Sequence, residues 1–381
     1  MTNKQTVKFG DICREVKLTT KDPIADGYER YIGLEHLDSG SLKIKRWGMI
    51  TEDNPSFTRV FKRGHILFGK RRPYLKKAAI AEFDGICSGD IIVLEASEAL
   101  STPDLLPFII QSNAFWQHAV STSSGSLSPR TKFSALKAFS FNLPRTQKQE
   151  SLKRIFQLSL NTIQCNQIAL NSLDNLKNSF SDRFKSAKNC VELSELLEFT
   201  TSGSRGWAKY YNDTEGALFI RITNMDRKSL KVDLSDKQFV KLPTGSSEGV
   251  RTKLRSGDIL VSITADLGII SFIDPDFNYD GYINQHIALC RPNKGKVNPR
   301  YLAYLLASKY GQKRIASLND GGAKAGISLR NLQTLKINIH DDQKQNEIVN
   351  ILQQIDFNVE CLKDSLSDID KVFKTALDRC F

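Results

Sequence analysis

Seven basic side chains lie close together in the sequence, and no acidic residue interrupts them. They fall within residues 62–77, where Phe68 and Tyr74 are interleaved with Lys62, Arg63, Lys70, Arg71, Arg72, Lys76 and Lys77. Ammonium and guanidinium groups bind the phosphate oxygens of nucleic acids, and such contacts position a protein on its target. The cluster therefore predicts a loop that contacts DNA, although a basic surface solvated only by water has the same composition.

Three further segments carry donors suited to phosphates or base edges. Residues 205–211 mix bases, aromatic residues and glycine, with Arg205, Lys209 and Tyr210 as the candidates. Two Gly-rich segments, residues 125–132 and 321–330, stand at equivalent places before the last expected strand of each half. Their candidates are Ser126, Arg130 and Lys132 in the first and Lys324 and Arg330 in the second. Glycine at these places also fits a simple turn.

Motifs for conventional catalysis are missing from the sequence. There is no phosphate-binding G-x-x-x-x-G-K-[ST] loop, no dinucleotide G-x-G-x-x-G, no H-E-x-x-H and no G-x-S-x-G elbow. An adenine methyltransferase needs an Asn/Asp-Pro-Pro-aromatic tetrad, and the nearest stretch, residues 53–57, lacks the second proline. We therefore expect a binding protein that holds no cofactor itself.

Two segments with acidic or histidine side chains are candidates for metal sites. Asp274, Asp276 and Asp280 resemble the carboxylates of a metal nuclease, but their Pro, Asn and Gly neighbours favour a turn. His286 falls within an expected β-like run, where a histidine that packs in the sheet is more common than a metal ligand. We expect no metal site.

Size and composition describe an ordered globular chain. Its 381 residues exceed the usual size of one hydrophobic core, and 40% of them are hydrophobic, so two domains are expected. No run approaches the roughly 18 apolar residues of a membrane span, and residues 1–10 are polar. Seven scattered cysteines without a C-x-x-C pair indicate reduced thiols. These features predict a cytoplasmic protein without a membrane partner.

The net charge of +12 points to a polyanionic partner such as nucleic acid. By segment, residues 1–145 carry +6, residues 146–187 carry +3, residues 188–340 carry +7 and residues 341–381 carry −4. The excess positive charge therefore lies mainly on two separate regions, either of which can meet phosphate. The acidic last segment is a poor candidate for DNA contact.

The chain contains an internal repeat, and a repeat bears on the whole fold assignment. Gln147 and Gln343, 196 positions apart, each precede a helical pattern. The same offset relates Pro103 to Pro299, Leu136 to Leu332 and Gly85 to Gly281. Each copy reads as a mixed α/β part followed by a helix of about 40 residues. Short β-like runs are expected at residues 65–68, 91–94, 259–263 and 283–289.

Both expected helices carry a long apolar stripe. In the second, Ile348, Ile355, Leu362, Ile369 and Ala376 recur every seven residues, with a parallel series of Leu352, Val359, Leu366 and Phe373. The first repeats the pattern with Leu152, Phe156, Ile163, Leu170, Leu173 and Phe180, interrupted by Ser159, Asn166 and Lys177. Such a/d stripes predict coiled-coil packing, and polar residues in the stripe fix its register.

These observations predict two α/β (mixed α+β) domains in a pseudo-twofold repeat, joined by two long antiparallel coiled-coil helices. The domains are residues 1–145 and 188–340, and the helical spacers are residues 146–187 and 341–381. Each helix needs a partner for its apolar stripe, and the other helix is the simplest one. The alternative, two helices that each belong to a separate core, stays open. The length of such an antiparallel pair would set the distance between the two α/β parts.

The combination resembles the specificity subunits of type I restriction-modification enzymes, and the resemblance covers the whole chain. Segments typical of that family are Ser256-Gly-Asp-Ile-Leu-Val, Gly281-Tyr-Ile-Asn-Gln-His-Ile-Ala-Leu, and Phe141-Asn-Leu-Pro followed by Gln147-Lys-Gln. Asp341 and Asp342 depart from the entry Leu143-Pro144 of the first copy, which blurs the boundary of the second domain.

The resemblance implies a function and partners. Each recognition domain of the family reads one half of a bipartite double-stranded DNA target, and the spacers set the gap between the halves. It further implies that two methyltransferase (M) subunits carrying S-adenosylmethionine dock on this chain. Motor-nuclease (R) subunits, which use ATP and Mg²⁺, would join for cleavage. None of these partners is visible in composition or spacing.

Two other classes of function stay open. One is an enzyme that contains a specificity-like module, against which the missing catalytic motifs argue. The other is an interaction scaffold whose helices bind protein while its α/β parts have lost DNA binding.

Overall fold

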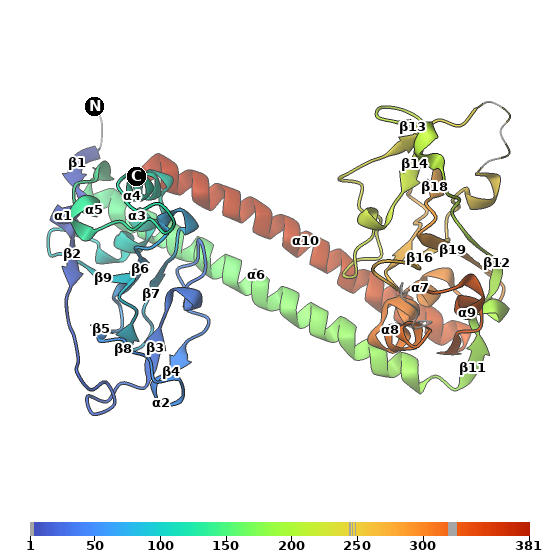
Figure 1. The fold of residues 1–381 in the computed structure, drawn as a ribbon, viewed down its shortest axis with the longest axis horizontal. Coiled ribbons are helices and arrows are strands. Elements are labelled where there is room, and N and C mark those ends of the chain that lie inside the picture. The colour runs from blue at the N-terminus through green and yellow to red at the C-terminus, as the bar shows by residue number, and fades with distance from the viewer. Residues whose placement is uncertain (1–3, 244, 246, 248, 319–325) are drawn as a thin grey trace. The chain divides into compact units, whose positions relative to one another are not determined.

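The computed structural model describes residues 4–243, 245, 247, 249–318 and 326–381. The chain forms two compact units, coloured along the chain in Figure 1. Unit 1 consists of Met1–Asn166 and Asp364–Phe381, and unit 2 consists of Gln167–Lys363. Each unit therefore contains one α/β part together with a segment from both long helices. The domain boundaries expected at residues 145, 187 and 340 stay a prediction.

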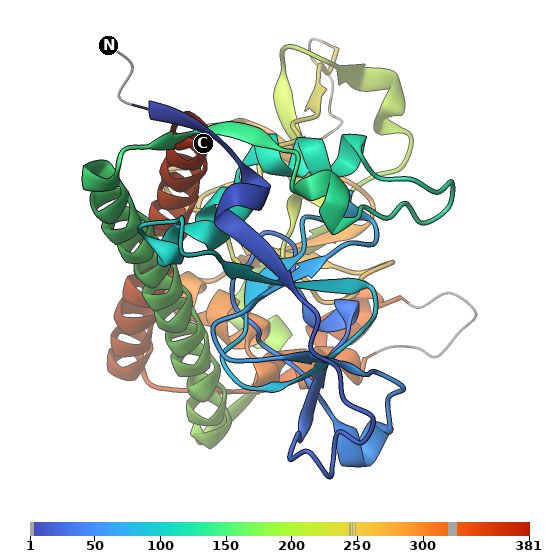
Figure 2. The same cartoon turned by 90° about the vertical axis from the view of Figure 1, so that its left-hand side faces the viewer.

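Unit 1 contains three small sheets with strand orders β2-β9-β6-β7, β4-β3-β8-β5 and β1-β10. The strands of the first are β2 (Cys13–Val16), β9 (Ile91–Ala96), β6 (Ile66–Gly69) and β7 (Ala78–Ile80). Those of the second are β4 (Gly48–Met49), β3 (Arg30–Ile32), β8 (Gly85–Cys87) and β5 (Arg59–Phe61). The third pairs β1 (Lys4–Lys8) with β10 (Ser140–Pro144), side by side in Figure 2.

Burial explains why these segments are strands. The run Ile91–Leu94 is apolar at four consecutive positions, and all four side chains are buried because the sheet is covered on both faces. Helices α1 (Phe9–Ile12), α3 (Leu106–Gln111), α4 (Asn113–Ser121) and α5 (Phe133–Leu136) supply much of that cover, and α2 is Ile50–Asp53. The strands expected at residues 65–68 and 91–94 are confirmed.

Unit 2 has three sheets of the same sizes, with orders β12-β19-β16-β17, β13-β15-β14-β18 and β11-β20. The first comprises β12 (Leu197–Ser202), β19 (Ile287–Pro292), β16 (Ile259–Ser262) and β17 (Ile270–Phe272). The others comprise β13 (Tyr211–Asn212), β15 (Phe239–Val240), β14 (Ala217–Ile220), β18 (Gly281–Ile283), β11 (Asn189–Glu192) and β20 (Lys336–Ile339). Its short helices are α7 (Pro299–Ala307), α8 (Lys309–Ala316) and α9 (Leu329–Gln333).

One expected strand is wrong. Residues 283–289 are not a single run, because β18 ends at Ile283 and β19 begins at Ile287. The side chain of Asn284 accepts a hydrogen bond from the backbone N–H of His286 at 3.1 Å, and this local bond turns the chain. His286 therefore lies in a turn, where its Nδ1 is 2.6 Å from the hydroxyl oxygen of Thr264.

The two long helices are confirmed. Helix α6 (Thr146–Ser186) has 41 residues and α10 (Asp342–Cys380) has 39, so α10 is roughly 58 Å long at 1.5 Å per residue. The buried and half-buried positions of α10 follow the predicted stripe, from Ile348 and Leu352 to Phe373. Each helix therefore presents its apolar stripe to the protein rather than to solvent.

In unit 1 the first part of α6 packs on the last part of α10. Phe156 of α6 is fully buried, and its ring lies 5.7 Å from that of Phe373 of α10. Leu377 joins the same core, and further along the helices Asn166 donates a hydrogen bond to the hydroxyl of Ser365 at 3.1 Å. The two segments thus run antiparallel (Figure 1).

Unit 2 repeats this packing with the other ends of the helices. Phe180 and Phe184 of α6 share a core with Ile348 and Leu352 of α10. Lys177, expected to interrupt the stripe, forms an ion pair with Asp356 of α10 at 2.6 Å. Asn166 and Lys177 thus each have a partner on the other helix, as register-fixing residues should. Supercoiling over the whole helix length stays a prediction.

Replacing Phe156 by alanine should lower the free energy of unfolding by roughly 3–5 kcal/mol, because it removes a buried ring and leaves a cavity. The matched control is Leu158→Ala on the same helix, where the side chain is 55% exposed and the change should be within about 0.5 kcal/mol. Urea unfolding followed by circular dichroism measures both. Equal effects would contradict the assigned packing.

Candidate nucleic-acid interface

The basic residues predicted to contact DNA divide between two places in unit 1. Strand β6 separates residues 62–65 from residues 70–77, which we call the basic loop. At the first place Lys62 forms an ion pair with Asp84 at 3.0 Å, and the same carboxylate accepts the backbone N–H of Arg63. Lys62 is therefore paired within the protein, and the candidate interface centres on the basic loop.

The basic loop has an unusual backbone. A 3-10 turn, Pro73–Leu75, is flanked by Arg72 and Lys76, which have φ values of +53° and +49°. Non-glycine residues rarely adopt this left-handed region, and each costs of order 1 kcal/mol or more unless its surroundings hold it there. Pro73 is buried and anchors the turn, whereas Tyr74 is 52% exposed. The turn therefore presents Tyr74 outward.

A second predicted segment packs against the basic loop. Residues 124–130, which we call the Gly125 loop, are closed by two backbone hydrogen bonds between Ser124 and Arg130, of 2.9 and 3.0 Å. Gly125 has a φ of +115°, which a residue with a side chain rarely adopts, so glycine suits this turn. Ser126 and Leu127 lie at the exposed tip.

Hydrogen bonds tie the two loops to each other. The backbone N–H of Arg72 donates to the carbonyl of Pro129 at 2.7 Å, and the backbone N–H of Thr131 donates to the carbonyl of Lys70 at 3.0 Å. The Arg71 guanidinium also reaches the hydroxyl of Ser128 at 3.3 Å. The structure therefore brings together two segments, residues 70–77 and 125–132, that the sequence suggested separately.

Asp90 joins the two loops electrostatically. Its carboxylate accepts two hydrogen bonds from Arg130, at 2.8 and 3.2 Å, and lies 3.5 Å from the Arg71 guanidinium. The hydrogen bond from Arg130 is the main reason that the pKa of Asp90 lies below its usual value. One carboxylate thus orients two arginines, whose planar donor groups then have a fixed direction.

The remaining basic residues of this region differ in what they contact. The Lys76 ammonium donates to the side chain of Asn113 at 2.7 Å, and that of Lys77 donates to the carbonyl of Leu34 at 2.7 Å. For Arg72 and Lys132, which are exposed, the described part of the chain offers no side-chain partner. These two are the cations best placed to meet phosphate oxygens.

In unit 2 the segment 205–211 is partly a packing element. Trp207 is buried and stacks on Phe219 with ring centroids 5.3 Å apart. The Lys209 ammonium lies over the ring of Tyr210 at 4.7 Å. Arg205 and Tyr211 are exposed, so the cations and one aromatic ring of this segment can face a ligand.

The backbone contact between the two loops, which we call the cross-tie, recurs in unit 2 without the charged side chains that accompany it in unit 1. Ile327 donates to the carbonyl of Ile263 at 2.9 Å, and Thr264 bridges to Gly326, as Arg71 bridges to Arg130. Ala265 takes the left-handed conformation of Arg72, with φ +61°. Arg330 is exposed on α9, and the predicted Lys324 lies outside the described residues.

Two of the three acidic side chains that resemble a metal site in the sequence have protein partners. Asp274 forms an ion pair with Arg300, and Asp280 pairs with Lys253 at 2.9 Å. Among the described residues, no group of three or more His, Cys, Asp or Glu side chains could hold a metal ion. No helix in the described ranges is long and apolar enough to cross a membrane.

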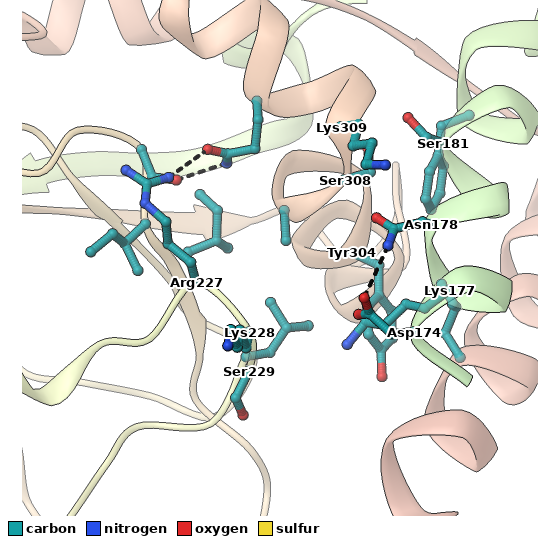
Figure 3. Close-up of a pocket in the computed structure, with 18 residues that line it drawn as sticks. Asp174, Lys177, Asn178, Ser181, Arg227, Lys228, Ser229, Tyr304, Ser308 and Lys309 are labelled. Carbon is teal, nitrogen blue, oxygen red and sulfur yellow. Dashed lines mark hydrogen bonds between the residues drawn. The ribbon is translucent and has the colours of Figure 1, made fainter. Parts of the chain in front are cut away.

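A cavity of about 250 Å³ in unit 2 lies between α6, residues 227–230 and the junction of α7 with α8 (Figure 3). Two of its four lining cations are paired within the protein. Lys177 pairs with Asp356, and the Arg227 guanidinium binds Asp266 and reaches Gln312 at 3.1 Å. The lining also includes Lys228 and Lys309 and several apolar side chains, among them Phe184, Leu230 and Ile270.

Known proteins resemble this chain in sequence. Residues 188–371 match the family model described as the type I restriction modification DNA specificity domain. The specificity subunit of the Escherichia coli type I restriction enzyme EcoDI is 27% identical over 158 residues, which cover 41% of this chain and 35% of that protein. The protein named as the MjaX specificity subunit of Methanocaldococcus jannaschii is 27% identical over 197 residues, covering 50% and 44%.

The fold also resembles solved structures over its whole length. A type I restriction-modification S subunit from M. genitalium aligns with a TM-score of 0.63 and 13% identity, covering 100% of this chain and 96% of that one. A chain from a study of assembly and conformational transition of a type I system aligns with a TM-score of 0.58 and 19% identity, covering 100% and 98%. By sequence and by fold, the chain is similar to type I specificity subunits. It spans less than half the length of the curated relatives it matches.

Sequence reasoning missed two residues of this site, Asp90 and Leu127. Asp90 is 40 residues from Arg130, so its role depends on the pairing of β6 with β9, which directly follows Asp90 in the chain. A signal was present, because Asp90 is the acidic residue of a Gly-Asp turn before a buried strand. No signal in the sequence marked Leu127, because a lone apolar residue among serines is ordinary on a protein surface.

Replacing Asp90 by asparagine should lower the free energy of unfolding at pH 7 by roughly 1–2 kcal/mol, because charge-assisted hydrogen bonds to Arg130 are lost. Since the folded pKa of Asp90 is lowered, its contribution is present above the ordinary carboxyl pKa of about 3.9 and is lost as the pH falls through the folded value. Urea unfolding at several pH values measures this difference.

The control is Glu98→Gln, which removes one exposed carboxylate in the same unit and should change stability little. If Asp90→Asn lowered the free energy of unfolding as much below pH 4 as at pH 7, the ionic role of Asp90 would be contradicted.

Proposed function

We propose that this chain reads double-stranded DNA as the specificity subunit of a type I restriction-modification complex. Each recognition domain reads one half of a bipartite target, and the helical spacers set the gap and dock methyltransferase subunits. The observation that carries the proposal is the pair of cross-tied loops in unit 1, with oriented arginines and exposed cations, in a chain similar to type I specificity subunits.

Electrostatics supports DNA as the ligand. The net charge of +12 is concentrated on the two α/β regions, and lysine and arginine side chains that replace counterions on phosphates supply much of the affinity for DNA. Sequence is read by contacts to base edges, for which Tyr74 and Ser126 are candidates in unit 1 and Arg205 and Arg330 in unit 2. The candidate Lys324 belongs to the same proposal.

The long helices support the proposed docking of partners. Both bury one stripe yet leave large apolar side chains exposed: Ile168 and Leu176 on α6, and Phe357 and Val372 on α10, are 46–67% exposed. Exposed apolar side chains on a helix are suited to a protein partner. Two methyltransferase subunits with S-adenosylmethionine, and motor-nuclease subunits with ATP and Mg²⁺, are the proposed partners. This chain is proposed to bind no cofactor itself and to be non-catalytic, and its work on DNA implies a cytoplasmic location.

The first test is methylation mapping of DNA from cells that express this chain with its methyltransferase partner, compared with cells that express the partner alone. We expect a new methylated motif with two defined halves and a fixed gap, present only with this chain. A complex that forms but leaves no new mark would contradict the proposal and favour a scaffold.

A second test concerns the basic loop. Arg71→Ser, Arg72→Ser and Lys76→Ser together should weaken DNA binding and flatten its dependence on salt, since each lost phosphate contact lowers the log-log slope by about 0.9. A sharper double variant, Arg72→Ser with Lys132→Ser, leaves the Asp90 contacts in place. Fluorescence anisotropy with a labelled duplex at several salt concentrations measures the slope.

The matched control is Lys21→Ser with Lys148→Ser, which removes the same charge from exposed positions outside the two loops. An equal loss of slope in the control would mean that net charge, and not the loop pair, determines binding.

A further inference from the structure

The two cross-tied loops of unit 1 carry exposed apolar side chains among their cations. Leu127, at the tip of the Gly125 loop, is 89% exposed and is the most exposed large apolar side chain in the described part of the chain. Tyr74 and Leu75, on the turn of the basic loop, are 52% and 38% exposed. A single exposed leucine is ordinary on a protein surface, but three such side chains on two joined loops need a reason.

The loops hold these side chains in place. The hydrogen bond from Arg72 to the carbonyl of Pro129 fixes the turn that carries Tyr74 against the Gly125 loop that carries Leu127. Asp90 adds a second tie through Arg71 and Arg130. In Figure 2 the loop between α4 and α5, in teal, extends away from the body of unit 1. Because the loops are already ordered, little conformational entropy remains to be lost on binding.

The surroundings of these apolar side chains point to the ligand. Arg72 and Lys132 are exposed beside them, and Arg130 is held by Asp90 with its side chain 48% exposed. A protein partner would favour an apolar surface with a polar rim of mixed charge. An apolar centre surrounded by cations instead suits DNA, where cations bind the two phosphate backbones and an apolar wedge enters between bases.

We propose that Tyr74, Leu75 and Leu127 form an apolar ridge that inserts against a base step of the first half-site and locally unstacks it. This inference rests on the proposed function and deepens it, because it names side chains that discriminate sequence through DNA deformability. Steps that unstack easily are favoured at such a wedge, so the ridge selects sequence without hydrogen bonds to base edges.

In the described part of unit 2, the counterparts of Tyr74 and Leu75 offer no exposed apolar side chain of this kind. In the cross-tie, Arg71 and Lys70 of unit 1 occupy the places of Thr264 and Ile263 of unit 2. Counted along the chain from these pairs, Tyr74 corresponds to Leu267 and Leu75 to Gly268. Leu267 packs against the hydrophobic core and Gly268 has no side chain. The effect of the ridge is therefore confined to one half of the target.

The test uses the chain co-expressed with its methyltransferase partner and compares Leu127→Ser, Tyr74→Ser and the double variant with the native chain. The probe is a duplex carrying the motif found by methylation mapping, with changed base pairs in either half. We expect the double variant to lose roughly tenfold to a hundredfold of its discrimination in one half only, the range of an aromatic or wedge contact to a base. The salt slope should stay unchanged, because no phosphate contact is removed.

The matched control is Ile24→Ser, a comparably exposed apolar residue of unit 1 outside the two loops, at 56% exposure, which should leave discrimination unchanged. Circular dichroism and thermal unfolding establish that all variants fold. Fluorescence of 2-aminopurine placed at successive steps of the first half-site should rise on binding the native chain and not the double variant.

Two results would overturn the inference alone: full discrimination and full 2-aminopurine fluorescence with the double variant, or a loss of assembly with the methyltransferase subunit at unchanged DNA discrimination, which would make the ridge a protein contact. A native chain that directs no motif-specific methylation would instead overturn the proposed function, and the inference with it.

Discussion

Burial of the apolar stripes of α6 and α10 is the constraint on which the rest of the structure depends. Neither helix is stable alone at this length without a partner for its stripe. In unit 1 the stripe residue Phe156 meets Phe373, more than two hundred positions later in the chain, and in unit 2 Phe184 and Ile348 share one core. Each α/β part is therefore completed by helix segments from the middle and from the end of the chain. A change in either helix therefore reaches the cores of both α/β parts.

A second constraint is the hydrogen-bonded cross-tie between the loop after β6 or β16 and the segment before the last strand. Among the described residues, one bridge and one backbone hydrogen bond of the cross-tie recur in both units. The left-handed residue recurs as well, Arg72 in one unit and Ala265 in the other. The side chains differ completely, because Arg71 and Arg72 correspond to Thr264 and Ala265. The frame is thus set by backbone hydrogen bonds, which any sequence can make, and the side chains are left to vary. A frame of this kind suits a protein that must read different base pairs with the same fold.

Periodicity predicted the long helices well, because an apolar repeat of seven residues sustained over four heptads is typical of long packed helices and of little else. Composition located the basic loop and the Gly125 loop, but it could not show that they touch. That contact depends on the pairing of strands, as does the position of Asp90. Charge alone also could not distinguish Lys62, Lys76 and Lys77 from Arg72, although each of these lysines has a protein partner in the structure. The single strand expected at residues 283–289 failed because one Asn284 side chain turns the chain, a local bond that apolar patterning does not register.

Under the proposed function, the unequal charges of the basic loop and of its counterpart in unit 2 affect how the two halves of a target are read. In unit 2 the loop that corresponds to the basic loop contains Asp266, held by Arg227, so a phosphate next to it would meet a carboxylate. The positive charge of that region must therefore act from other segments, among which Arg205, Lys209 and Arg330 are exposed. Phosphate contacts fix where a domain sits on the duplex, and base contacts then follow from that position. Two domains with one fold but different phosphate contacts would sit differently on DNA, so the two halves of the target need not resemble each other.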